Sequence, residues 1–287
     1  MGYRGTFTLQ GIIKISRPIN LLLVAFAQIM TAAFLVETSN LGVPVLKDHN
    51  LYLIMLATVM VTAAGYIIND YYDVKIDYVN KPEQVIIGRG VKRRVALLLH
   101  SLLNFAGIGL GWLVSPSVAL VIFVSAFLLW LYSNSLKRQP FTGNFTVAAL
   151  TGASIWLIGF HYQKSELLIL AYAMFAFFIN LIREIVKDIE DRHGDKKHGC
   201  RTLPIVIGFR ETKKVIFLIA IVFVCSILVV AYRINNPSLY FYFGGLSVLF
   251  FLFMHKIYFA DRKAHFTQLS MLSKLLMLTG IASMALL

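Results

Sequence analysis

Charged side chains are scarce in this sequence, and their scarcity excludes most soluble folds. Only 14% of the 287 residues are charged, whereas 58% are hydrophobic. A soluble domain carries about 25% charged and about 45–50% apolar residues. The mean hydropathy of +0.74 therefore indicates a protein that is dissolved in lipid. No polar stretch is long enough to form a second domain, so we expect one membrane-embedded domain over residues 1–287.

Cysteine and acidic residues are also few. The two cysteines, Cys200 and Cys225, are far apart and form neither a disulfide framework nor a metal or redox motif. Lys and Arg outnumber Asp and Glu by 27 to 14, which gives a net charge of +13. Nothing in the chain resembles a nucleic-acid-binding module, and basic residues in a membrane protein gather in its cytoplasmic loops. We therefore expect the lipid bilayer as a partner, no nucleic acid, and no protein partner.

Apolar runs near the length needed to cross a bilayer recur along the whole chain. The third and fourth are separated only by Ser115-Pro116-Ser117, so a count of eight spans stays open beside the nine we predict. The first run is too long for the core of a signal peptide and lacks a small-residue cleavage site, which favours a retained helix. The predicted spans are 17–36, 51–70, 95–114, 117–133, 142–160, 166–184, 213–232, 238–255 and 270–287.

The distribution of Lys and Arg predicts the topology. With the amino terminus inside, 23 of the 27 basic residues fall in the inner segments, and the three outer loops each hold one, Lys47, Lys164 and Arg233. Because positive charge collects on the cytoplasmic side, we expect an all-α, multi-pass protein of the cell membrane with a cytoplasmic amino terminus. The segments after the second and sixth spans are then cytoplasmic.

Each of these two segments begins with acidic residues at helical spacing. At about 100° per residue, the members of each cluster share one face of a helix. Stacked carboxylates repel one another, and ionisable groups at the membrane are usually functional. Mg²⁺ prefers oxygen ligands and binds through one or two carboxylates together with substrate phosphates. Two such faces on one side of the membrane predict a Mg²⁺–diphosphate site; the alternative is solvated charge beyond the helix ends. The first cluster is Asn69, Asp70, Asp73 and Asp77, and the second is Glu184, Asp188, Asp191 and Asp195.

The same residues resemble the UbiA superfamily of intramembrane prenyltransferases. The resemblance rests on Asn-Asp-x-x-Asp-x-x-x-Asp at 69–77 and Asp-x-x-x-Asp at 191–195, and it covers nearly the whole chain. Supporting segments are Arg17-Pro18-Ile19-Asn20, Tyr132-Ser133-x-x-Leu136-Lys137, Gly143-Asn144, and Arg201-Thr202-Leu203-Pro204 with Gly208. The resemblance implies nine transmembrane helices around a central cavity, with a cytoplasmic cap that carries the two Asp-rich motifs.

The resemblance also implies roles for individual residues. Mg²⁺ is the implied cofactor, and a polyprenyl diphosphate and a lipophilic acceptor are the implied substrates. The catalytic residues would be Asp73, Asp77, Asp191 and Asp195; the metal-binding set would be Asn69, Asp70, Asp73, Asp77, Asp188, Asp191 and Asp195; Lys137 and Arg89 would bind diphosphate; and Asn20 would line the cavity.

One loop departs from the family pattern. Many relatives have Lys-Pro-x-Arg-Pro-Ile-x-Ser-Gly after the first motif. Here the usual Arg is Gln84 and, if the pattern's Gly is matched to Gly88 in a loop that is one residue shorter, the usual Ser is Ile87. This departure affects the role expected for the loop in binding substrate, and with it the activity expected of this chain.

Within the superfamily, residues 183–191 and the later Thr-Leu-Pro are most similar to the geranylgeranylglycerol-phosphate geranylgeranyltransferase branch. That branch prenylates a glycerol-phosphate hydroxyl in ether-lipid synthesis. The alternatives are a prenyltransferase acting on 4-hydroxybenzoate or naphthoate, a catalytically silent relative, an alcohol phosphotransferase of phospholipid synthesis, and a cation-coupled transporter. The transporter reading is disfavoured because a transport site belongs near the bilayer midplane.

Overall fold

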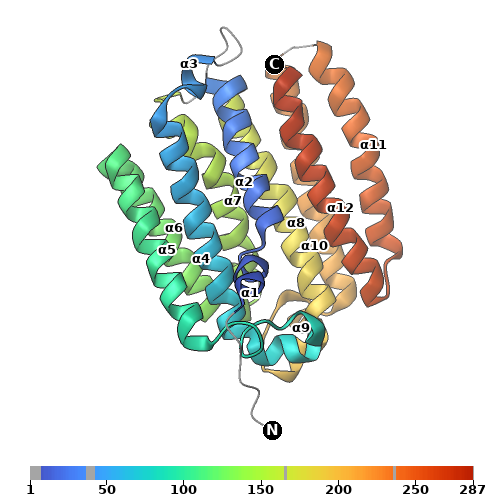
Figure 1. Cartoon of the computed structure of the whole chain (residues 1–287). Helices are drawn as coiled ribbons and strands as arrows, with labels where there is room; N and C mark the ends of the chain where they lie inside the picture. Colours follow the sequence, from blue (N-terminus) through green and yellow to red (C-terminus); the bar gives the residue numbers. More distant parts are fainter. Residues whose placement is uncertain (1–7, 37–42, 165–166, 235–236, 287) are drawn as a thin grey trace. The chain divides into compact units, whose positions relative to one another are not determined.

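The computed structural model of the chain describes residues 8–36, 43–164, 167–234 and 237–286, and these residues are mostly helical (Figure 1). Within these ranges, nine helical segments are long and apolar enough to cross a membrane. The prediction of an all-α, multi-pass membrane protein is therefore confirmed, with nine spans rather than eight. The spanning segments are α2 (Pro18–Thr31) with η1 (Ala32–Val36), α4 (His49–Asn80), α5 (Arg93–Val114), α6 (Pro116–Asn134), α7 (Thr142–His161), α8 (Leu167–Lys197), α10 (Phe209–Ile234), α11 (Pro237–Phe259) and α12 (Lys263–Ala282) with η5 (Ser283–Leu286).

Shorter elements connect the spans. The described residues contain no β-strand beyond an isolated bridge between Ile87 and Val91. The connecting elements are α1 (Leu9–Ile15), α3 (Val43–Leu46), η3 (Pro82–Gln84), η4 (Leu136–Arg138) and α9 (Leu203–Val206).

A single capped turn separates α5 from α6. Ser115 is extended (φ −169°), and its side chain accepts a hydrogen bond from the backbone N–H of Val118 at 3.2 Å. Pro116 occupies the first turn of α6, where its missing N–H costs nothing. The predicted break at residues 115–117 is thus confirmed.

Two spans run well past their predicted ends. The apolar runs end near residues 70 and 184, but α4 continues to Asn80 and α8 to Lys197. Backbone hydrogen bonds do not need apolar side chains, so each helix continues until its sequence stops it. Pro82 follows the end of α4, and Gly199 follows α8 in the left-handed region (φ 74°). Both acidic clusters therefore lie on helices, and α12 likewise begins at Lys263 rather than at residue 270.

The chain divides into two compact units. The first comprises residues 1–26, 48–138 and 193–200, and the second comprises residues 27–47, 139–192 and 201–287. In the first unit α4, α5 and α6 pack side by side (Figure 1). Gly107 of α5 lies against α4, where a Cβ would come within 2.8 Å of Val61 and 3.1 Å of the Ala57 carbonyl. Small residues of this kind let membrane helices approach closely.

Each unit has its own apolar cluster. In the first, Ile15, Ile67, Ile87, Val91 and Ala96 join α1, α4, α5 and the loop between α4 and α5. In the second, α8 packs its buried residues with those of α10, α11 and α12; these residues include Ile182, Ile185, Ile216, Ile257 and Leu269.

Large apolar side chains also cover the outside of the helices. Trp112 is 66% exposed, Tyr232 79% and Phe241 85%. On a soluble protein such surfaces would be a liability, but on spanning helices they suit contact with lipid.

Candidate active site

The first acidic motif lies on the last turns of α4 and already holds a cation. Lys137 of η4 places its Nζ 2.5 Å from Oδ1 of Asp73 and donates to Oδ1 of Asn69 at 3.2 Å. The side chains of Lys137 and Asp73 are only 10% and 15% exposed. An amide oxygen and a carboxylate oxygen, one helical turn apart, thus converge on one positive charge.

A second cation neutralises Asp70. Arg17, between α1 and α2, places Nη2 2.6 Å from Oδ1 of Asp70, and its guanidinium lies 4.8 Å from the ring centroid of Tyr66. Burial lowers the pKa of Arg17, but the attraction of Asp70, Tyr66 and Asp77 more than offsets this and raises the pKa above its ordinary value. The backbone of Arg17 is in the left-handed region (φ 54°), which is costly for a residue other than glycine.

In the sequence, Arg17 is notable only as part of the segment Arg17-Pro18-Ile19-Asn20, and nothing there assigns it a role. Its position before Pro18 carried no sign of the pairing with Asp70, 53 residues away. Arg17 is therefore a functional candidate that the sequence did not reveal.

The end of the second motif belongs to the same unit as the first. Burial raises the pKa of Cys200 to about 11, with the negative charges of Asp195 and Asp73 adding to the shift. Arg138 and Lys137 act on the same thiol in the opposite direction. The Cys200 thiol therefore lies in the electrostatic field of Asp73, Lys137 and Asp195.

The last residue of α4 also contacts the second motif directly. The backbone N–H of Gly194, which precedes Asp195, donates to Oδ1 of Asn80 at 2.8 Å. Asn80 is the last residue of α4 and is 7% exposed.

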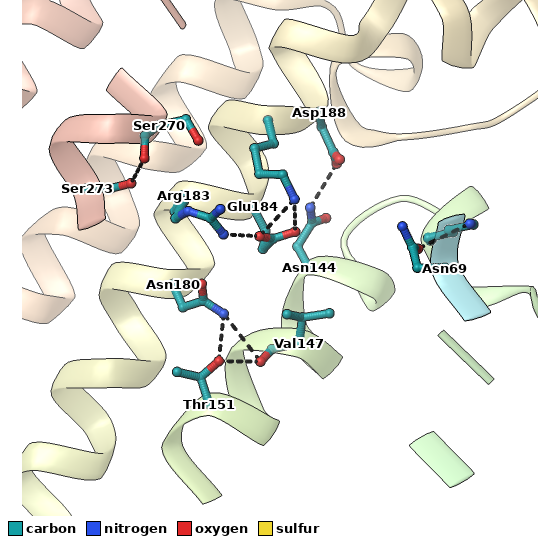
Figure 2. A network of polar contacts seen from close by, with 12 residues as sticks. Asn69, Asn144, Val147, Thr151, Asn180, Arg183, Glu184, Asp188, Ser270 and Ser273 are labelled. Atoms are coloured by element: carbon teal, nitrogen blue, oxygen red, sulfur yellow. Dashed lines mark hydrogen bonds and ion pairs between the residues drawn. The ribbon is translucent and has the colours of Figure 1, made fainter. Parts of the chain in front are cut away.

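In the second unit, Asp188 of α8 has an amide partner. Nδ2 of Asn144, on the first turn of α7, donates to Oδ2 of Asp188 at 2.8 Å (Figure 2). The spacing of Asp188, Asp191 and Asp195 on the continuous helix α8 keeps these carboxylates on one face.

Deeper along α8, two cations flank one buried carboxylate (Figure 2). Oε1 of Glu184 accepts from Nη1 of Arg183 at 2.6 Å, and Nζ of Lys187 lies 3.1 Å from Oε2 of Glu184. One turn further, Nδ2 of Asn180 donates to Oγ1 of Thr151 at 2.8 Å. Buried charged groups are costly unless they are paired, and these are paired.

The structure does not bring every predicted residue to this site. Arg89 is exposed, donates to the carbonyl of Pro82 at 2.9 Å and lies 5.1 Å from the ring centroid of Tyr78. Its contacts stay within its own loop and the end of α4. Asn20 is half-buried on the first turn of α2, and its backbone N–H donates to the carbonyl of Arg17 at 2.9 Å. The assignments of Arg89 to diphosphate and of Asn20 to a cavity stay predictions.

The altered loop has a structural explanation. Ile87 is 2% exposed and packs in the apolar cluster with Ile15 and Val91, while Gln84 is exposed. A serine at position 87 would place a hydroxyl in that cluster. The departure from the family pattern thus exchanges a polar group for packing between the loop and α1.

The residues of the first motif suit Mg²⁺. Among the described residues, no three His, Cys, Asp or Glu side chains are gathered closely enough to hold a metal by themselves. Mg²⁺ rarely needs three such protein ligands, since it commonly binds one or two carboxylates and completes its coordination shell with water and substrate phosphates. The ammonium of Lys137, between Asn69 and Asp73, marks a point where these oxygens stabilise positive charge.

A helical bundle in lipid that presents oxygen ligands and basic side chains at the ends of its helices is typical of an intramembrane enzyme for a phosphorylated lipid. Residues 22–276 match the family model described as the UbiA prenyltransferase family. This chain belongs to that family, and it is a prenyltransferase.

Relatives of similar sequence belong to one kind of prenyltransferase. The chain is 39% identical over 219 residues to a digeranylgeranylglyceryl phosphate synthase of Methanoregula boonei, covering 76% of this chain and 73% of the relative. The synthase of the same name from Methanosphaera stadtmanae is 34% identical over 230 residues, covering 80% and 78%.

Solved structures share the fold. One, from work on digeranylgeranylglyceryl phosphate synthase in membranes, matches with a TM-score of 0.71 at 24% identity, covering 97% of this chain and 99% of that one. A UbiA homologue from Archaeoglobus fulgidus bound to GPP and Mg²⁺ matches with a TM-score of 0.68 at 15% identity, covering 96% and 99%. The predicted all-α, multi-pass fold of the UbiA type is thereby confirmed, and the cytoplasmic cap that carries the Asp motifs stays a prediction.

Proposed function

We propose that this chain transfers a geranylgeranyl group from its diphosphate to the hydroxyl of geranylgeranylglycerol phosphate, in a reaction that requires Mg²⁺. The main structural support for a metal site is that Asn69 and Asp73 already bind a cation. Their side-chain oxygens lie 3.2 and 2.5 Å from the ammonium of Lys137, which takes the place that a metal ion would have. The acceptor is supported by the names of the relatives at 34–39% identity, which are digeranylgeranylglyceryl phosphate synthases.

The two acidic faces would hold the metal ions and the diphosphate. Asp73, Asp77, Asp191 and Asp195 are the central carboxylates of this proposal, and Asn69, Asp70 and Asp188 complete the oxygen ligands. Bound Mg²⁺ would neutralise the charge that develops on the departing diphosphate.

The basic side chains would then change partners. Lys137 and Arg17 pair with Asp73 and Asp70 in the structure, and they would donate to diphosphate oxygens if these carboxylates held metal instead. Arg is well suited to bidentate contact with a phosphate, and Lys acts as a point charge. Preorganised donors of this kind stabilise the leaving group as the bond to it breaks.

The transfer itself needs little covalent chemistry from the protein. The C1–O bond of the allylic diphosphate breaks with its electron pair leaving on the diphosphate, and the acceptor oxygen forms a new ether bond to C1. The hydroxyl proton passes to the departing diphosphate. The apolar interior holds the isoprenoid chains and excludes water, which would otherwise capture the carbocation.

We also propose that the amino terminus and the ends of α4 and α8 with the Asp motifs face the cytoplasm. The support is the strong excess of Lys and Arg on that side, 23 against three. Membrane-impermeant labelling of a cysteine placed in residues 1–7 tests the orientation. Labelling of intact cells would contradict it, and labelling only after lysis is expected.

The reaction is tested with purified protein in liposomes. Geranylgeranyl diphosphate is the donor, and geranylgeranylglycerol phosphate competes with 4-hydroxybenzoate and a naphthoate as acceptors, with Mg²⁺ or with EDTA. We expect Mg²⁺-dependent transfer to the glycerol phosphate. Transfer to a ring alone would overturn the acceptor, and the absence of both transfer and diphosphate release would overturn the activity.

A further inference from the structure

Asn80 continues the acidic face of α4. It lies eleven residues after Asn69, which at 100° per residue returns it to within about 20° of the same direction. It is also three residues after Asp77. Unlike the acidic members of this face, Asn80 carries no charge and is almost completely buried, at 7% exposure.

The carboxamide of Asn80 contacts the backbone of the second motif. Oδ1 of Asn80 accepts the N–H of Gly194 at 2.8 Å, across 114 positions in the sequence. Gly194 stands between Asp191 and Asp195. This hydrogen bond therefore joins the end of one metal-binding helix to the middle of the other motif.

The contact also explains why residue 194 is a glycine. Gly194 lies within α8 and is not among the residues with positive φ, so its backbone conformation does not require glycine. A Cβ there would come within 2.5 Å of Cγ, Nδ2 and Oδ1 of Asn80, closer than real Cβ atoms come to other atoms. Only glycine lets α8 approach the carboxamide this closely.

Charge alone would not produce this approach. Asp77 and Asp195 flank the contact in sequence, and two carboxylates repel one another without a cation between them. A neutral side chain that accepts a backbone N–H holds the helices together without adding to that repulsion.

We propose that Asn80 is a positioning residue that sets the spacing between the two Asp motifs, with Gly194 as its receptor, and that this spacing determines the affinity for the metal. The inference rests on the proposed Mg²⁺–diphosphate function. Residues that orient metal ligands without touching the metal typically change metal affinity by about 10–100-fold when they are removed.

Helix propensity alone makes a different prediction for Gly194→Ala. Alanine is the better helix former, so the local effect of this change on α8 is favourable. The proposal predicts the opposite result, because the new methyl group strikes the carboxamide and forces the motifs apart. The pair Asn80→Ala and Gly194→Ala also predicts non-additivity, since Asn80→Ala removes the group that the methyl would strike.

The test compares wild type, Asn80→Ala, Gly194→Ala and the double variant, with Asn104→Ala as the control. Asn104 is a half-buried asparagine on α5 of the same unit, whose amide contacts His100. Binding of Mn²⁺ to the purified protein is followed by electron paramagnetic resonance, and thermal unfolding in detergent reports folding. The Mg²⁺ concentration that gives half-maximal prenyl transfer is measured on the same samples.

We expect each single variant to bind Mn²⁺ at least about tenfold more weakly and to need correspondingly more Mg²⁺. The double variant should be no worse than Asn80→Ala, and Asn104→Ala should match wild type. Folded single variants with Mn²⁺ affinity within about twofold of wild type would overturn the inference. If Gly194→Ala does not fold, the Mn²⁺ affinity of Asn80→Ala alone decides whether the inference holds. Wild type that binds Mn²⁺ but transfers no prenyl group overturns the proposed function instead.

Discussion

Replacing Lys137 by methionine should tighten metal binding while it slows catalysis. In the structure the ammonium lies 2.5 Å from Asp73 and 3.2 Å from Asn69, so a metal at these oxygens must displace it. A hydrogen bond to a charged group contributes a net of about 1.5–3 kcal/mol. At about 1.4 kcal/mol for each factor of ten, removing this competitor should strengthen Mn²⁺ binding by about 10–100-fold.

Prenyl transfer should change in the opposite direction. Without Lys137 a donor to the departing diphosphate is lost, and removal of one such preorganised donor costs about 10²–10³ in rate. The assay pairs Mn²⁺ binding by electron paramagnetic resonance with transfer at saturating Mg²⁺.

Arg138→Met is the matched control for this prediction. It removes the same charge from the adjacent residue, but Arg138 is exposed and solvent screens its charge. We expect little change in either quantity. Mn²⁺ binding to Lys137→Met that is unchanged or weaker than in wild type would refute the stand-in role of Lys137.

Two further variants test the structure around the site. Ile87→Ser restores the usual family residue. It should lower the free energy of unfolding by about 2–5 kcal/mol, because Ile87 is 2% exposed in the apolar cluster. A variant that is as stable as wild type in thermal unfolding and more active in the transfer assay would contradict this packing role. Glu184→Ala should destabilise the protein by about 3–5 kcal/mol, because it leaves the largely buried Arg183 and Lys187 without the carboxylate that pairs with them. Glu184→Ala with unchanged unfolding in detergent would show that this network contributes little, and Glu211→Ala, whose ion pair is exposed, is the control.

Much of the fold was predictable because lipid imposes simple rules. Length and apolarity determine which segments span, so the nine spans are confirmed along with the break at Ser115. The ends of α4 and α8 were placed too early because hydropathy reports the edge of the apolar run and not the end of backbone hydrogen bonding. The acidic residues extend both helices into a polar region that such a criterion does not recognise.

The site was predictable where helical spacing alone defines it. The oxygen-bearing face of α4 follows from the 3.6-residue period, and the same period could have added Asn80 to it. The pairing of Arg17 with Asp70 depends on how distant segments pack, and periodicity carries no information on that. For Ile87, comparison with the family pattern identified a departure, but only its burial explains it.

The central claim is that the two Asp motifs carry Mg²⁺-dependent prenyl transfer. The most direct measurement is the transfer of geranylgeranyl from its diphosphate by Asp73→Ala and by Asp191→Ala, each compared with wild type at saturating Mg²⁺. We expect both variants to remain folded in the membrane and transfer to be abolished in each. Substantial transfer by either folded variant would contradict the claim.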